Sequence, residues 1–253
     1  MNHSAFSHPV ITSLLPVVLL IGLGLLAGKR EWIKASAQGD YSKLIFSLLL
    51  PPLLFRTMAQ SHPENLMLLP VFVYLGSMVI LMALVMVWQG LNKRGAILGL
   101  AASYGNTVMI GIALIGYAYG EAGQAVLFSL LSVHAIIMLT GSTLMLEWLE
   151  MKTMQAEKPH QQARPGRLAL QALWNAVLQP TTWPILLGLA FSQTELTLPL
   201  VIDKPLQLLG QAFSPLALVL VGLTLSNTKF GEHIVPALGL SVLKNFVQPL
   251  LVF

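Results

Sequence analysis

The sequence predicts an all-α membrane protein whose helices cross the bilayer several times. Of its 253 residues, 55% are hydrophobic and only 9% are charged, whereas a soluble domain carries about 25% charged residues. Apolar runs long enough to span a bilayer recur along nearly the whole chain. The net charge of +4 comes from basic residues scattered over short loops. Such scatter is typical of membrane topology and does not indicate nucleic-acid binding.

Eight apolar segments are expected to form the membrane spans. The first four are residues 10–28, 44–58, 66–89 and 96–119, and the second four are residues 125–146, 181–198, 206–226 and 234–253. Between the fifth and the sixth, the polar residues 147–167 predict a loop. The amphipathic residues 168–179 that follow predict a helix on the membrane surface.

The distribution of Lys and Arg predicts the orientation of these spans. Eleven basic residues fall on one side of an eight-span arrangement, and only Arg56 and Lys204 fall on the other. Lys244 lies within the eighth span. The positive-inside rule therefore predicts an outside N-terminus and a cytoplasmic loop 147–167.

Prolines and glycines recur at a nearly constant separation, which indicates an internal repeat. The pairs are Pro16–Pro180, Gly24–Gly188, Pro52–Pro215 and Pro70–Pro236. Five spans separate the copies, and because five is odd, the second copy is expected to lie inverted in the membrane, as in many secondary transporters. The predicted division is a first repeat over residues 1–147, a cytoplasmic loop with a surface helix over residues 148–180, and an incomplete second repeat over residues 181–253.

Residues 101–120 (AASYGNTVMIGIALIGYAYG) contain polar and flexible residues that a simple lipid-spanning helix would avoid. Asn106 and Thr107 stand beside Gly105, and Gly111 follows. A buried Asn is costly without hydrogen bonds, and Gly loosens a helix. Since an irregular backbone at membrane depth must face protein or a water-filled cavity, the segment predicts a broken helix that forms half of a substrate site.

Several motifs together resemble the auxin efflux carrier family, which includes bacterial dicarboxylate carriers and plant auxin carriers. Residues 106–114 (NTVMIGIAL) are similar to the family's NT-x-x-x-G-x-P-L, and residues 50–55 (LPPLLF) are similar to its LPA-x-LF. Residues 180–189, 214–218, 222–223 and 244–250 also match. One departure is Ala113, which stands where the family has a helix-breaking proline.

The resemblance implies a ten-helix inverted-repeat fold with crossed, broken helices four and nine. It implies elevator-like transport of small organic anions, such as malonate, malate or auxin-like weak acids, across a bacterial inner membrane by a homodimer. A partner of Asn106 is expected near position 270, about one repeat later. We therefore expect this chain to hold eight of the ten helices, as a fragment or a truncated and inactive product.

The expected substrate-binding residues are Asn106, Thr107, Gly111, His134 and Lys244, and the expected crossover or hinge residues are Gly105, Ala113, Pro52 and Pro215. The polar pair of the break could instead only join helices. His134 lies mid-span, where an ordinary histidine pKa of about 6.5 suits proton coupling, or it is a neutral side chain bonded to a carbonyl. Lys244 is a counter-charge to substrate, a partner of an acid beyond Phe253, or a snorkelling side chain.

A membrane-embedded enzyme or a metalloprotein is less well supported by the residues. The chain has no cysteine, which excludes disulfides, thiolate metal sites and Cys nucleophiles. Its histidines lack metal-ligand spacing, and no cofactor is expected. A membrane-embedded enzyme would need paired catalytic groups at depth, but all ten acids lie in loops or at span ends. The predicted partners are an organic anion, a coupling proton and the lipid bilayer.

Overall fold

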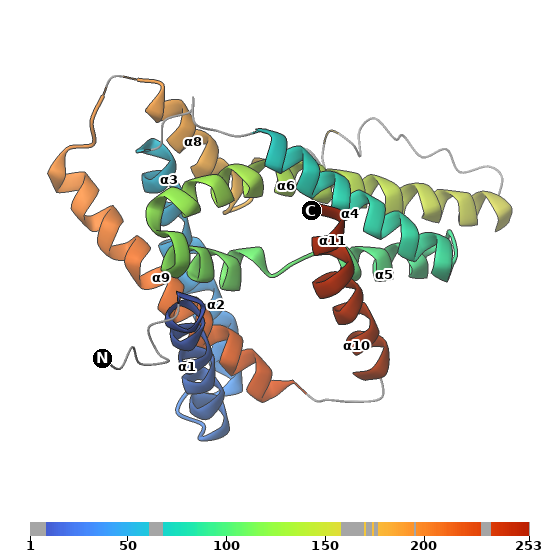
Figure 1. Cartoon of the computed structure of the whole chain (residues 1–253), viewed down its shortest axis with the longest axis horizontal. Helices are drawn as coiled ribbons and strands as arrows, with labels where there is room; N and C mark the ends of the chain where they lie inside the picture. The colour runs from blue at the N-terminus through green and yellow to red at the C-terminus, as the bar shows by residue number, and fades with distance from the viewer. Residues whose placement is uncertain are drawn as a thin grey trace, which may run out of the picture. The chain divides into compact units, whose positions relative to one another are not determined.

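The computed structural model describes residues 9–60, 68–157, 170, 174, 177–194, 196–228 and 234–252. This part of the chain is built from helices and contains no strand, which confirms the all-α fold (Figure 1). Four of its helical segments are long and apolar enough to cross a bilayer: Ala35–Ala59, Leu69–Gln89, Lys93–Leu131 and Leu200–Asn227. Three shorter apolar helices cover Ser13–Lys29, Thr182–Ser192 and Ala237–Val252. The protein is therefore a polytopic helical membrane protein.

The chain divides into two compact units, each drawing helices from both predicted repeats. The first unit comprises Met1–Leu66, Asn106–Ser132 and Pro180–Lys229, and the second comprises Met67–Gly105, Val133–Gln179 and Phe230–Phe253. The chain passes from one unit to the other several times, and two of these passages lie in its middle, at Gly105–Asn106 and at Ser132–Val133.

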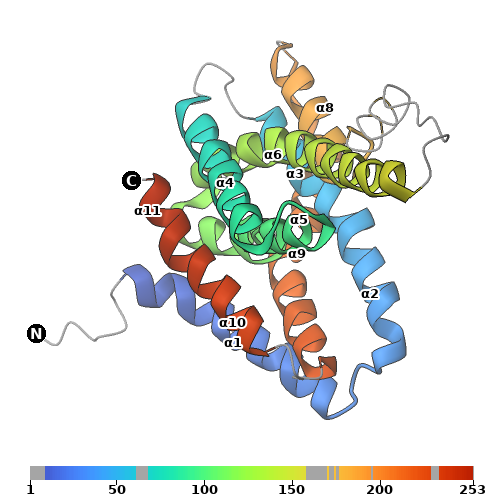
Figure 2. The ribbon, with the colours of Figure 1, turned by 90° about the vertical axis from the view of Figure 1, so that its right-hand side faces the viewer.

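The first unit is organised around α9 (Leu200–Asn227). It packs against α1 (Pro9–Lys29) and α3 (Leu50–Ala59), and α3 also packs against α8 (Thr182–Ser192). Before α3 the chain forms η2 (Ala35–Ala37), α2 (Gln38–Leu44) and the wide turn η3 (Ile45–Leu49), and Figure 2 shows α2 and α3 as one run of helix. Leu50, Leu54, Ile185 and Phe213 are fully buried where these helices meet, because the apolar stripes of α3, α8 and α9 face one another.

Two glycine contacts in the first unit are related by the residue offset of the predicted repeat. A Cβ at Gly24 would overlap the backbone oxygen of Val219, and a Cβ at Gly188 would overlap the backbone oxygen of Phe55. Gly188 follows Gly24 by 164 residues, and Val219 follows Phe55 by the same number. The contact of α1 with α9 is thus repeated by the contact of α8 with α3. This register pairs Pro215 with Pro51, one residue away from the Pro52 that the sequence pattern pairs with it.

Three wide helical turns share one hydrogen-bond pattern. They are η3, η5 (Thr107–Gly111) and η6 (Leu243–Val247), and in each the next residue donates its N–H to the carbonyl five residues earlier: Leu50 to Ile45, Ile112 to Thr107 and Gln248 to Leu243. The residue after this donor is Pro51 for η3, Ala113 for η5 and Pro249 for η6. A proline ring clashes with the carbonyl four residues earlier in a regular helix, and we infer that the wide turn moves that carbonyl out of the path of the ring.

The second unit contains α4 (Leu68–Gln89), α5 (Lys93–Ser103), the distal part of α6 (Ile112–Glu157), and the run α10 (Ile234–Val242), η6 and α11 (Gln248–Val252). Figure 2 shows α10 and α11 as one continuous run. Helix α4 packs against α5, and α11 packs against α4. Met86, Ala96 and Leu149 are buried together in this unit.

Several element boundaries differ from the sequence-based expectation. The predicted loop at residues 147–167 begins later, because α6 continues to Glu157 through a stretch rich in good helix formers (EWLEMKTMQAE). The sixth span is shorter than expected: α8 is 11 residues long and ends at Ser192. Residues 196–199 have no regular secondary structure, and α9 begins at Leu200, directly after Pro199. The rest of the predicted loop and most of the surface helix lie outside the described residues.

Candidate functional site

The predicted helix break lies where the sequence places it. Helix α5 ends at Ser103, and Tyr104, Gly105 and Asn106 are not helical. Asn106 then caps the wide turn η5: its side-chain oxygen accepts the N–H of Met109 at 3.3 Å, and its backbone oxygen accepts the N–H groups of Ile110 and Gly111. The break therefore forms without the proline that the family has at Ala113.

The other residues of the break have packing roles that agree with this geometry. A Cβ at Gly111 would come within 3.2 Å of the methyl group of Thr107, so the small residue lets the turn close over Thr107. Ala113 is 1% exposed and packs with Val17 and Leu218 in a small apolar cluster. The expected hinge residue Pro52 lies in the first turn of α3, and Pro215 lies inside α9.

After the break, the chain bends sharply at Gly120 within the first unit. Gly120 has φ +64° and ψ −156°, a conformation that is essentially restricted to glycine. The Gln124 side chain then lies against Gly116, and its amide nitrogen donates to the carbonyl of Ile112 at 3.3 Å. The two arms of the bend are thereby held close together.

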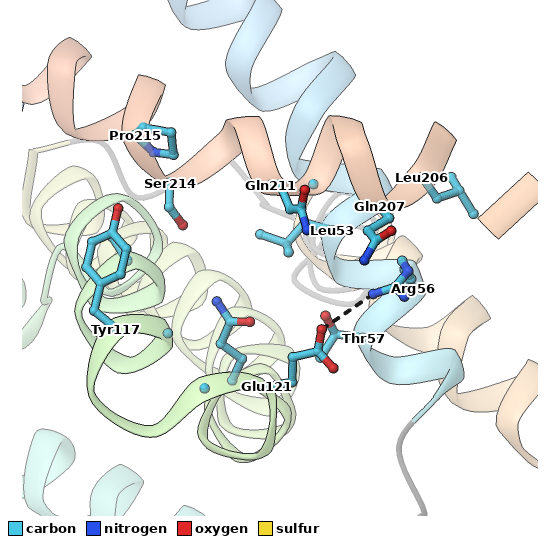
Figure 3. A pocket seen from close by; sticks show the side chains of 15 residues that line it. Leu53, Arg56, Thr57, Tyr117, Glu121, Leu206, Gln207, Gln211, Ser214 and Pro215 are labelled. Atoms are coloured by element: carbon cyan, nitrogen blue, oxygen red, sulfur yellow. Dashed lines mark ion pairs between the residues drawn. The ribbon is translucent and has the colours of Figure 1, made fainter. Parts of the chain in front are cut away.

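A pocket of about 230 Å³ lies between the bend of α6 and the helices α3 and α9, all in the first unit (Figure 3). Ala113 and Pro215 line it, so it adjoins two of the expected hinge residues. Its remaining lining is mostly polar or small: Leu53, Arg56, Thr57, Gly116, Tyr117, Gly120, Glu121, Gln124, Leu206, Gln207, Gly210, Gln211 and Ser214. Figure 3 shows Arg56 and Gln207 at one end, and Tyr117 and Ser214 at the other.

Arg56 is the centre of an ionic network in this pocket. Its Nε donates to Asp203 Oδ1 at 2.7 Å and its Nη2 donates to Oδ2 at 3.3 Å. Gln60 donates to the same Oδ1 at 3.1 Å. The Nη1 of Arg56 lies 3.6 Å from Oε1 of Glu121. The Arg56 and Asp203 side chains are 15% and 19% exposed, so their two-point pairing joins α3 to α9 in a largely desolvated place.

The second unit brings together two of the expected substrate-binding residues. The amino group of Lys244 donates to the backbone oxygen of Tyr104. The ring of His134 lies between those of Tyr104 and Tyr74, with ring centres 5.0 and 5.9 Å away. His134 is 3% exposed, and its Nδ1 has no hydrogen-bond partner among the described residues.

The expected site residues are thus divided between the two units. Asn106, Thr107 and Gly111 belong to the first unit, and Gly105, His134 and Lys244 belong to the second. That all of them contact one substrate stays a prediction. The sequence interpretation gave no role to Arg56 or its pocket, although Gln207, Gln211 and Ser214 form a readable signal. Their spacing of four and three residues places one polar stripe along an apolar helix.

Comparison with known proteins agrees with these features. Residues 9–253 match a family described as membrane transport protein. The chain is 24% identical over 231 residues to the uncharacterized transporter YfdV of Escherichia coli strain K12, an alignment that covers 87% of this chain and 70% of that protein. The same values hold for YfdV of Escherichia coli O157:H7 and of Shigella flexneri. The chain belongs to the membrane transport protein family, which is the auxin efflux carrier family that its motifs resemble.

Proposed function

We propose that this membrane transport protein is a secondary carrier of small organic anions. The main observation that supports this proposal is the helix break at the start of η5, where Asn106 caps the helix. The first N–H groups of a helix lack partners within it, and the helix dipole favours negative charge there. A broken helix thus offers an anion hydrogen-bond donors at membrane depth without a full charge, and Asn106 and Thr107 add polar side chains.

The pocket beside the break supports a small substrate. Pockets for drug-sized ligands measure about 300–1,000 Å³, and this one measures about 230 Å³. That size suits a ligand smaller than a drug molecule, such as the short dicarboxylates malonate and malate.

The transport cycle that we propose is elevator-like alternating access in a bacterial inner membrane. Its outside N-terminus and cytoplasmic loop follow from the distribution of Lys and Arg. Pro52 and Pro215 would act as hinges, Lys244 as a counter-charge, and His134 as the proton-coupling group. The buried Nδ1 of His134 supports that last role, because an unpartnered polar atom inside a protein is costly without a function. The family suggests a homodimer.

Uptake of labelled malonate into proteoliposomes tests the function. We expect saturable uptake by the wild-type chain and loss of uptake in Asn106→Leu. The control is Asn227→Leu, the same change at the exposed end of α9, which should transport normally. Equal uptake by Asn106→Leu and wild type would show that Asn106 at the break does not bind the substrate.

The pH dependence of uptake tests the role of His134. Proton coupling through His134 predicts uptake that depends on pH. His134→Gln removes the proposed proton carrier and should abolish that dependence. Wild-type uptake that stays constant when the pH is varied would contradict the proposed coupling.

A further inference from the structure

Arg56 is the one cation among the residues that line the pocket, and two of its three nitrogen atoms are already committed. Nε and Nη2 pair with both oxygens of Asp203. Such a two-point pairing fixes the plane of a guanidinium group as well as its position. The third nitrogen, Nη1, is therefore held in a defined direction.

The partner of Nη1 is weakly bound. The Glu121 carboxylate lies 3.6 Å away, and its side chain is 76% exposed, against 19% for that of Asp203. Exposed ion pairs contribute little to stability, because water screens the charges and both side chains lose freedom. Another carboxylate could replace Glu121 at Nη1 without disturbing the pairing with Asp203.

Gln207 of α9 offers a second donor at the same end of the pocket as Arg56. The side-chain oxygen of Gln207 accepts the amino group of Lys204 at 3.0 Å, so its amide nitrogen is the end left to face the pocket. Figure 3 shows Gln207 and Glu121 both pointing toward Arg56, from α9 and from the bend of α6. A carboxylate has two oxygens, and a guanidinium nitrogen with a nearby amide nitrogen can donate to both.

We propose that this end of the pocket is a carboxylate-binding site, in which the substrate anion replaces Glu121 at Nη1 of Arg56 and accepts a second hydrogen bond from Gln207. Asp203 positions the guanidinium group, and Glu121 occupies the site when no anion is bound. The ligand class is a small dicarboxylate, which rests on the proposed function. The site is separate from the Asn106 break, so the two can be tested apart.

Equilibrium binding of labelled malonate to the purified full chain tests this site without requiring transport. Removing the competing carboxylate with Glu121→Gln should tighten binding about two- to five-fold, the value of a weak exposed ion pair. Glu31→Gln removes the same charge from an exposed side chain outside the pocket and should leave the dissociation constant unchanged. The double variant Arg56→Gln, Asp203→Asn avoids an unpaired buried charge and should bind at least about ten-fold more weakly.

Three results would overturn the proposal: malonate binding to Glu121→Gln that is no tighter than to wild type, undiminished binding to the double variant, or no binding to the folded wild-type chain. Asn106→Leu separates this site from the proposed function. Binding that survives in Asn106→Leu, in a chain whose wild type takes up no malonate, would refute the transport and retain the site. Binding that depends on Asn106 and not on Arg56 would refute the site and retain the transport.

Discussion

Ala113 occupies a position that should accept proline, although it lies inside a helical run. At the end of each wide turn, one residue donates its N–H to the carbonyl five residues earlier. The residue after that donor is Pro51 for η3, Ala113 for η5 and Pro249 for η6. The substitution Ala113→Pro would therefore make η5 resemble η3 and η6.

The expected cost follows from the two ways in which proline harms a helix. A proline in a regular helix interior costs about 3 kcal/mol or more, through the lost N–H bond and the ring clash. At Ala113 we expect the wide turn to relieve the clash, so the backbone cost of the proline is at most one hydrogen bond, about 1 kcal/mol. The next residue, Leu114, lies in regular α6, so Leu114→Pro should have the full cost of about 3 kcal/mol.

Thermal unfolding of the two purified variants in the same detergent measures the difference. For a chain of this size, 1 kcal/mol corresponds to a change in Tm of about 2–4 °C. Ala113→Pro should thus lower Tm by about 2–4 °C, and Leu114→Pro by about 6–12 °C. Equal losses in the two variants would refute the reasoning that the wide turn accommodates proline.

Two glycine substitutions test the packing and the bend. Gly24→Ala should destabilise the protein by at least about 2 kcal/mol in the same assay, because the new methyl group overlaps Val219 and overpacking costs about 1–3 kcal/mol. In the control Gly22→Ala the new methyl group meets nothing within 4 Å, so this variant should be neutral or stabilising. Equal effects of the two substitutions on stability would contradict the close contact at Gly24. Gly120→Ala should lower the stability of the protein by about 1–3 kcal/mol, because an alanine is strained at a φ of +64°. The control Gly141→Ala, in open space within α6, should stabilise the helix by about 0.5–1 kcal/mol. An unchanged stability in Gly120→Ala would contradict the bend.

Local chemistry determined the features that the sequence predicts well. The all-α membrane fold follows from apolar length and low charge, because lipid leaves the backbone no other partner than itself. The break at Asn106 follows from residues within a few positions of one another. The internal repeat stays a prediction from the spacing of prolines and glycines, and the contacts of Gly24 and Gly188 share its offset of 164 residues.

Tertiary structure alone decided which side chains meet across helices. Arg56 and Asp203 are 147 residues apart, and no local pattern links them; they meet because α3 and α9 share a buried apolar face. The same holds for His134 and Tyr104. The bend at Gly120 that brings Glu121 to Arg56 is a backbone angle, which a glycine in the sequence permits but does not require. The helical membrane class and the break were thus readable from neighbouring residues, while the pocket depended on long-range packing.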